Sequence, residues 1–185
     1  GLLAYAAGAP ELAGKILYLI VDDESTVRLC GELNADNVRY EYARAHAMLP
    51  RQRFAEYLDQ EDFGIYLRTR FVPGEAVNEL LHFSGTVSGT DVQTVVDDGI
   101  SQQVTVKTMT TGAANAIAPN ECVLRPYRTF FEVEQPESPF VFRCKRKGDV
   151  IGFGLFPADG GLWKYAAIHN LESYIRKYLD AAGPD

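Results

Sequence analysis

The chain has 185 residues, 46% of them hydrophobic and 23% charged, with a formal net charge of -7. This composition is typical of a globular protein with one substantial core. The acidic excess argues against nucleic-acid binding, which needs a basic surface facing the phosphates. No apolar run approaches the roughly 18 residues of a membrane span. The opening GLLAYAAGAPELAGK lacks the features of a secretory signal, so we expect no membrane contact.

The three cysteines, Cys30, Cys122 and Cys144, are odd in number and far apart. They show neither a CxxC pair nor a Cys/His spacing that would hold zinc. A disulfide framework is equally unexpected in a chain with so large a core. We therefore expect reduced thiols in a cytosol, with no metal and no cofactor.

The first part of the chain predicts a short helix followed by an antiparallel meander. Residues 1–7 resemble the end of an amphipathic helix. Residues 16–22 are apolar on both faces, which is typical of a central strand. Residues 27–33 and 38–48 alternate in polarity and are separated by short polar turns, which indicates two further strands.

The middle of the chain predicts one helix and then more strands. Apolar side chains recur at helical spacing over 51–71, with a break expected near Gln60, until Pro73 and Gly74 stop the pattern. We expect strands over 80–87, 93–99 and 101–110, and a small-residue connector over 113–120.

The last third predicts an interrupted strand, a hairpin and a final helix. Pro126 restricts any strand over 123–133 to a sheet edge. Residues 140–146 and 150–156 flank a Lys-Gly-Asp turn, as in a hairpin, and 162–180 has one apolar face. The sequence thus predicts a single α+β domain over 1–185, with a largely antiparallel sheet and the 51–71 and 162–180 helices packed on it.

Two acidic turns are weak candidate sites. Asp97 and Asp98 could contact a metal or ligand, or act as a paired acid and base. However, Asp-Gly after a β-branched run is also a common hairpin turn, which we favour. Asp159 with two glycines, just before Trp163, could cradle an anion at a helix start. An N-cap is the favoured interpretation.

The segment LRPYRTFFEVEQP is harder to dismiss as a site. Arg125, Tyr127 and Arg128 could stack on a planar ligand or bind an anion. Alternatively, the two arginines pair with Glu132 and Glu134 and only fix the segment, which is the interpretation we favour. We also keep Trp163 as a candidate ligand contact.

No catalytic motif accompanies these residues. His46, His82 and His169 stand apart from any Ser, Cys or carboxylate motif, and no G-x-S-x-G element occurs. This argues against an enzyme and favours a protein that acts by binding a partner. The alternative is a small-molecule or nucleotide binder, or an enzyme, with an Arg/Asp pocket. Stacking of single-stranded nucleic acid on aromatics such as Tyr40, Tyr42, Phe140 and Phe142 would require a basic groove.

Three blocks, DDGISQQVTVKT, LRPYRTFFEVEQP with PFVFR, and ADGGLWK, resemble the YfdQ-like family of phage and prophage proteins of unknown function. The resemblance runs over most of the chain. It implies a phage accessory protein in the host cytosol and makes this chain the C-terminal domain of a longer product. It brings no activity, cofactor or site residue. Pro157 and Met109 depart from the family pattern, where an acidic residue and a glycine are expected.

Aromatic residues also suggest self-assembly. Ten Tyr and ten Phe are many for a monomer of this size, and Tyr57 and Tyr165 fall at outward-facing positions. Tyr and Phe are enriched in interface cores. Strands at Pro126 or over 150–156 would leave open sheet edges that need covering. We expect a homo-oligomer, most simply a two-fold dimer, although the aromatics could instead fill the protein's own core.

Overall fold

The structure is a computed structural model that describes residues 1–87, 92–97, 102–108, 112–117, 121–148 and 150–182. In 92–97, 102–108 and 112–117 it describes the backbone alone. The chain divides into two compact units. Unit 1 comprises residues 1–49, 128–136 and 162–185, and unit 2 comprises 50–127 and 137–161. Both are therefore discontinuous in sequence, and the single-domain expectation stays a prediction.

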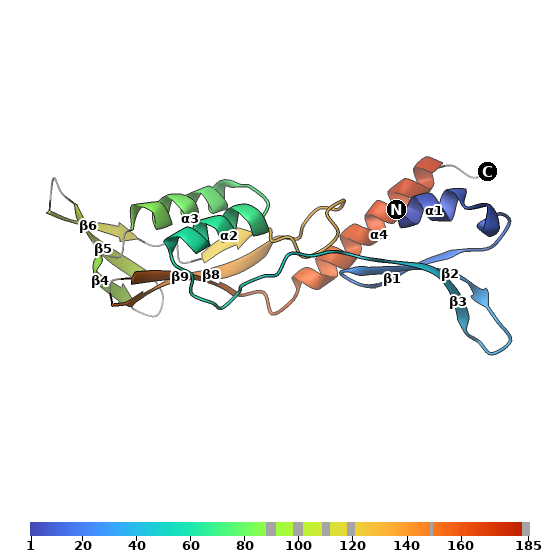
Figure 1. Cartoon of the computed structure of the whole chain (residues 1–185), viewed down its shortest axis with the longest axis horizontal. Helices are drawn as coiled ribbons and strands as arrows, with labels where there is room; N and C mark the ends of the chain where they lie inside the picture. The colour runs from blue at the N-terminus through green and yellow to red at the C-terminus, as the bar shows by residue number, and fades with distance from the viewer. Residues whose placement is uncertain (88–91, 98–101, 109–111, 118–120, 149, 183–185) are drawn as a thin grey trace. The chain divides into compact units, whose positions relative to one another are not determined.

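Unit 1 combines a three-stranded antiparallel sheet with two helices (Figure 1). The strands are β1 (Tyr18–Asp23), β2 (Thr26–Leu33) and β3 (Arg39–His46), in the order β1-β2-β3. The chain enters through α1 (Leu2–Gly8) and a 3-10 turn, Pro10–Leu12. It ends in α4 (Trp163–Ala182), a helix of 20 residues. The predicted meander and both helices are confirmed.

The place of the first strand in this sheet differs from the prediction. β1 lies at an edge and β2 in the centre. The apolar run of β1 reflects contacts with α4, which packs against this strand. In β2 the pairing with β3 shifts between Leu29 and Cys30. Both of these residues are fully buried, because a bulge breaks the strict alternation of faces.

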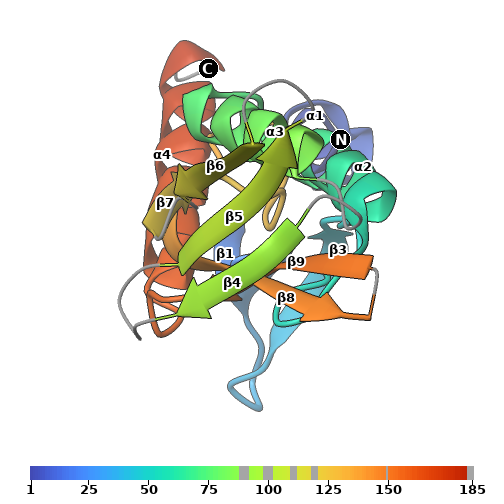
Figure 2. The ribbon, with the colours of Figure 1, turned by 90° about the vertical axis from the view of Figure 1, so that its left-hand side faces the viewer.

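Unit 2 contains two three-stranded antiparallel sheets and two helices. One sheet has the order β7-β8-β9, from β7 (Glu121–Leu124), β8 (Ser138–Lys147) and β9 (Val150–Pro157). Helices α2 (Gln60–Arg70) and α3 (Glu75–Thr86) lie together over it (Figure 1). The other sheet, β4 (Val92–Asp97), β5 (Gln102–Thr108) and β6 (Gly112–Ile117), forms a meander (Figure 2). The α+β class is thus confirmed, and the described residues form three small sheets instead of one large sheet.

Aromatic rings fill the core of unit 2. Phe142 and Phe153 pair across the hairpin of β8 and β9 with nearly parallel rings, 6.2 Å between centroids. Phe63 of α2 stacks on Phe153 at 5.4 Å, and Phe83 of α3 meets Phe142 edge-on at 5.6 Å. Such pairs add to the free energy of burial. These rings tie both helices to the sheet.

Three predicted elements of unit 2 were wrong in type or extent. The helix predicted from residue 51 begins only at Gln60, where the Asp59 carboxylate accepts a hydrogen bond from the Asp62 N–H at 2.8 Å and supplies the N-cap. The strand predicted over 80–87 is largely the helix α3. The connector predicted over 113–120 contains β6, which pairs with β5.

The predicted hairpin is confirmed, and its sheet edges are partly covered. β7 ends at Leu124, before Pro126, at a sheet edge as expected. β9 forms the other edge, where the segment before α2 bonds to it: Leu58 and Phe153 exchange N–H···O bonds of 2.9 and 2.8 Å. Backbone bonds of this kind shield an edge from other chains. Any oligomer interface on β9 would have to form around this contact.

Candidate functional site

The loop 128–136 of unit 1 is organised by one buried amide, the side chain of Gln135. Its Oε1 accepts hydrogen bonds from the N–H groups of Arg128 and Thr129, at 2.9 and 3.2 Å. Its Nε2 donates to the carbonyl of Phe130 at 2.9 Å and, more weakly, to those of Thr129 and Val133. The Thr129 hydroxyl donates to the Glu24 carbonyl at 2.6 Å. These bonds satisfy backbone groups that burial would otherwise leave unpaired.

Two of the predicted site residues meet at this loop. The guanidinium carbon of Arg128 lies 4.1 Å from the centre of the Trp163 ring. Arg128 is 6% exposed, so little of this side chain is accessible to a ligand. The pair attaches the loop to the start of α4. This contact gives Arg128 a structural role through Trp163, which differs from the predicted pairing with Glu132 and Glu134.

The other predicted residues of that segment lie in unit 2. Tyr127 N–H donates to the Arg70 carbonyl at 2.9 Å, and the Tyr127 carbonyl accepts from the Gln52 amide at 3.1 Å. Arg125 lines a small pocket of about 140 Å³ beside Glu75 and Glu137. Arg125 and Arg128 thus belong to different units.

The structure describes the side chain of one predicted acidic site residue, Asp159, and only the backbone of another, Asp97. The Asp159 carboxylate accepts from the Ser138 hydroxyl at 2.9 Å and from the Gly161 N–H at 3.1 Å. α4 begins only at Trp163, so Asp159 closes a loop and does not stand at the predicted N-cap position. The backbone of Asp97 ends β4. The Asp97 side chain and all of Asp98 lie outside the described part of the chain.

All three histidines and all three cysteines lie in the described part of the chain. His46 shares a hydrogen bond of 3.1 Å with the Thr26 hydroxyl, and His82 lies on α3 and not on the predicted strand. All three cysteines are free and buried, and burial raises the pKa of Cys122 and of Cys144 to about 12. In the described residues no group of three His, Cys, Asp or Glu side chains could hold a metal ion.

A charge network on the sheet of unit 1 is structural. Arg28 donates to Asp22 at 2.6 Å, and Arg44 donates to Glu41 at 2.9 and 3.0 Å. These bonds hold the pKa of both carboxyls below their usual range. Both acids therefore stay ionised and paired, a state unsuited to proton transfer at neutral pH.

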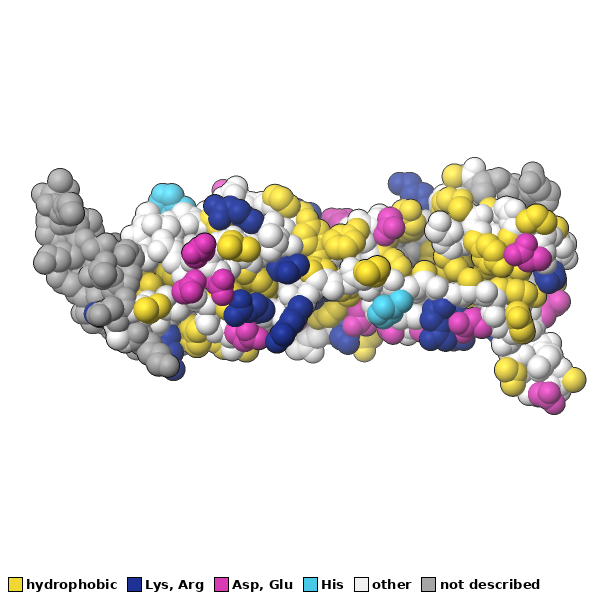
Figure 3. All heavy atoms as spheres, in the orientation of Figure 1, with side chains coloured by type: hydrophobic (Ala, Val, Ile, Leu, Met, Phe, Trp, Pro, Cys, Tyr) yellow, Lys and Arg dark blue, Asp and Glu magenta, His cyan; other side chains and the backbone are white. Residues whose placement is uncertain are grey.

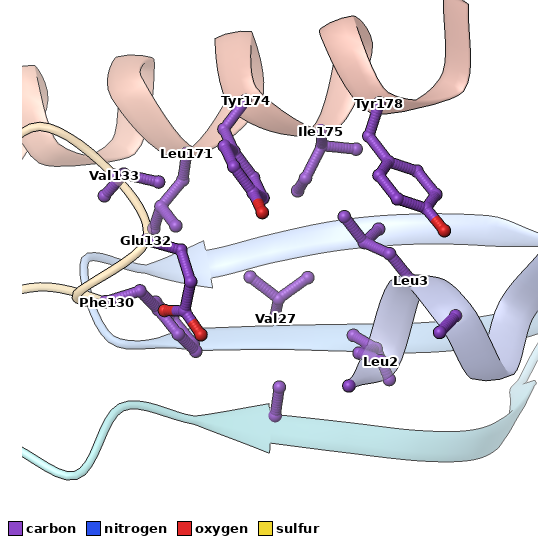
Figure 4. Close-up of a pocket in the computed structure, with 13 residues that line it drawn as sticks. Leu2, Leu3, Val27, Phe130, Glu132, Val133, Leu171, Tyr174, Ile175 and Tyr178 are labelled. Atoms are coloured by element: carbon purple, nitrogen blue, oxygen red, sulfur yellow. The ribbon is translucent and has the colours of Figure 1, made fainter. Parts of the chain in front are cut away.

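An apolar cleft in unit 1 is the feature that sequence reasoning missed. It has a volume of about 370 Å³ and lies between α4, α1, the sheet and the loop 128–136 (Figure 4). Its lining comprises the following residues: Gly1, Leu2, Leu3, Ala4, Val27, Ala45, Phe130, Glu132, Val133, Leu171, Tyr174, Ile175 and Tyr178. Ligand pockets are typically of this size and this apolar.

Comparison with protein-family models, curated proteins and solved structures finds no match to this chain. The resemblance to the YfdQ-like family therefore stays a prediction. Among the described residues, no helix is both long enough and apolar enough to cross a bilayer.

Proposed function

We propose that this chain is a non-enzymatic phage accessory protein that acts in the host cytosol by binding a partner protein, most simply a second copy of itself. The phage context rests on the resemblance of the sequence blocks alone. Three free, buried thiols agree with a reducing compartment. The gene neighbourhood is the direct test of the context, since a setting without phage genes would remove it.

The observation that carries the proposal is the exposed apolar surface of unit 1. The helix α4 spans 20 residues, yet of its described side chains only Ala167 and Leu171 are buried. Tyr165 and Leu162 are 74% and 68% exposed, and Tyr40 on β3 is 68% exposed. Figure 3 shows hydrophobic side chains among charged ones on the face of unit 1 that it draws. Tyrosine is enriched in the cores of protein interfaces.

The alternative, a nucleotide or small-molecule site built from the predicted Arg/Asp set, has less support. Arg128 is buried against Trp163, and Arg125 lies in the other unit. Stacking of nucleic acid on Phe140 and Phe142 is ruled out because both rings are fully buried. The surface favours a large partner over these ligands.

The test is sedimentation velocity over a range of micromolar concentrations. We expect a concentration-dependent species of twice the 20.5 kDa mass of the chain. Tyr165→Arg should shift it toward the monomer, because a charge at an interface core is costly. Ile65→Arg in unit 2, where Ile65 is 53% exposed on α2, is the matched control. A single 20.5 kDa species at every concentration would refute self-assembly.

A further inference from the structure

We infer that the outer edge of β1 is the surface on which two copies of this chain pair, strand against strand, about a two-fold axis at Ile20, an inference that rests on the self-assembly proposed above. Three features of unit 1 support this contact. They are the open backbone of an edge strand, an apolar groove beside that edge, and the charges at the ends of the groove.

The backbone of β1 is open on one side. Among the described strands, β1 pairs with β2 alone. The Ala47 N–H donates to the Ser25 carbonyl at 2.8 Å. Since hydrogen-bonded pairs alternate along an antiparallel ladder, this bond and the strand registers set the direction of every backbone group in the sheet. Ile20 therefore faces β2, and Leu19 and Val21 direct their N–H and C=O groups outward. In the described part of the chain, no backbone group bonds to them.

An apolar groove of about 480 Å³ lies at this edge. Every residue of 17–21 lines it, so side chains from both faces of β1 take part, together with α1 and α4. On α4 the lining residues Glu172, Arg176 and Leu179 are spaced as one stripe. Tyr165 lies on the same stripe two turns before Glu172. A strand added to β1 would therefore run beneath this stripe of α4.

The chain itself carries a strand that fits the groove. Residues 16–21 are six apolar side chains in succession, so both faces of a second β1 are apolar. Ile16 is 57% exposed and Tyr18 is 39% exposed. An uncovered apolar edge of this kind is prone to pair with another strand. A two-fold contact brings a surface against itself, so the strand that meets β1 is β1 of the second copy.

Helix α4 runs antiparallel to β1 and places a positive charge at one end of the groove. Lys164, at the start of α4, forms an ion pair of 2.9 Å with Glu24, just after β1. The helix then continues back over the strand (Figure 1). Its later residues therefore lie over the beginning of β1, and among them Arg176 is exposed and lines the groove.

The charges favour an antiparallel pair of strands. β1 ends in Asp22 and Asp23. Asp22 is already paired with Arg28, so the charge that a second copy meets is mainly that of Asp23. An antiparallel partner brings this carboxylate toward Arg176 at both ends of the contact, whereas a parallel partner would set two acidic ends side by side. Glu172 lies one turn before Arg176, over the apolar middle of the pair.

A disulfide tests the position of the axis. When the outward groups of Leu19 pair with those of Val21 of the second copy, the two Ile20 residues stand opposite each other. Their Cα atoms are then about 4.5 Å apart, a separation that a disulfide bridges. On mild oxidation Ile20→Cys should form a linked dimer at least about tenfold faster than the control Ile65→Cys, which is exposed on α2. All three native cysteines are buried, so they do not compete.

Charge variants test the same contact in solution. Ile20→Lys sets two like charges at the axis and should raise the dimer dissociation constant at least about tenfold in sedimentation velocity. Arg176→Glu should raise it about three- to tenfold, because the contact occurs twice. Lys177→Glu is the matched control: it makes the same charge change on an exposed neighbour that does not line the groove, and its effect should stay below about twofold. Arg176→Glu is a surface change, so it keeps the test open even where Ile20→Lys unfolds the chain.

The outcomes separate this contact from self-assembly itself. A monomer at every concentration would refute both. A dimer that neither Ile20→Lys nor Arg176→Glu weakens, and that Ile20→Cys links no faster than its control, would overturn the β1 contact and leave self-assembly standing. A monomer that binds an unrelated apolar peptide, with binding lost in Ile20→Lys, would assign the edge to a foreign strand and overturn pairing between copies.

Discussion

Replacement of Gln135 by methionine should destabilise unit 1 severely, although it barely changes the size of the side chain. The variant removes the acceptor of two buried N–H groups, at 2.9 and 3.2 Å, and the donor to the Phe130 carbonyl at 2.9 Å. Each buried polar group that loses its partner costs about 1–3 kcal/mol. We expect a loss of about 3 kcal/mol or more, which at a slope of about 2 kcal/mol/M lowers the urea midpoint by about 1.5 M.

Gln135→Glu adds a pH test of the same contacts. One carboxylate oxygen can still accept the hydrogen bonds that Oε1 accepts. The other oxygen would face the carbonyls to which Nε2 donates in the wild type, and it cannot donate to them. The neutral acid can donate to one of them, so folding should raise the pKa of the introduced carboxyl above its unfolded value near 4.3. The loss of stability of this variant relative to the wild type is therefore smallest at acid pH, and it grows as the pH rises from about 4 toward 7.

The assay for both variants is urea unfolding followed by the emission of Trp163. This residue is the chain's one tryptophan, and its ring lies against Arg128 in unit 1. Asn170→Ala is the control, because Asn170 donates an exposed hydrogen bond to the Glu134 carbonyl of the same loop; it should cost less than about 1 kcal/mol. A midpoint for Gln135→Met equal to that of the control would refute the reasoning, as would a Gln135→Glu deficit that does not change with pH.

The remaining predictions concern packing, thiols and the cation–π pair. Gly154→Ala should lower the free energy of unfolding by about 1–3 kcal/mol, because the new Cβ would lie 3.2 Å from a backbone oxygen. Gly85→Ala, with open space around it, should instead stabilise α3 by about 0.5–1 kcal/mol. Equal urea midpoints for the two variants would contradict both predictions. Cys122 and Cys144, whose pKa burial raises to about 12, should resist Ellman's reagent at pH 8 until urea unfolds the chain. Rapid labelling of the native protein would contradict this. Arg128→Lys should shift the Trp163 emission and cost about 0.5–2 kcal/mol, because lysine cannot stack on the indole; an unchanged spectrum would speak against the stacked geometry.

The sequence predicted elements whose pattern is local. The hairpin of β8 and β9 has alternating strands and a glycine turn, and Gly148 adopts a φ of 64° there. The prediction was wrong for α3, where the short apolar run was interpreted as a strand. Leu80, Phe83 and Val87 are spaced as one buried helical face, a signal that was available. The sequence of β6 is rich in alanine and does not have the pattern of a strand. β6 is a strand because its backbone pairs with β5.

The candidate site was less predictable than the fold. Arg125, Tyr127 and Arg128 are adjacent in sequence, yet they serve different units. Glu132 was considered only as an ion-pair partner. The cleft draws its lining from α1, two strands, the loop and α4. Only the tertiary structure brings these segments together, so no residue spacing along the chain could predict the cleft.

The order of elements in unit 1 has a consequence for biosynthesis. β3 ends at His46, whereas α4 begins at Trp163, so a ribosome completes the whole of unit 2 before the helix that covers β1. During this interval the apolar face that includes Val27 and Leu29 lacks its later partners. Contacts so distant in sequence form slowly because the long loop must close first. A nascent chain stalled before α4 should therefore recruit chaperones, and it should acquire protease resistance in unit 2 before unit 1.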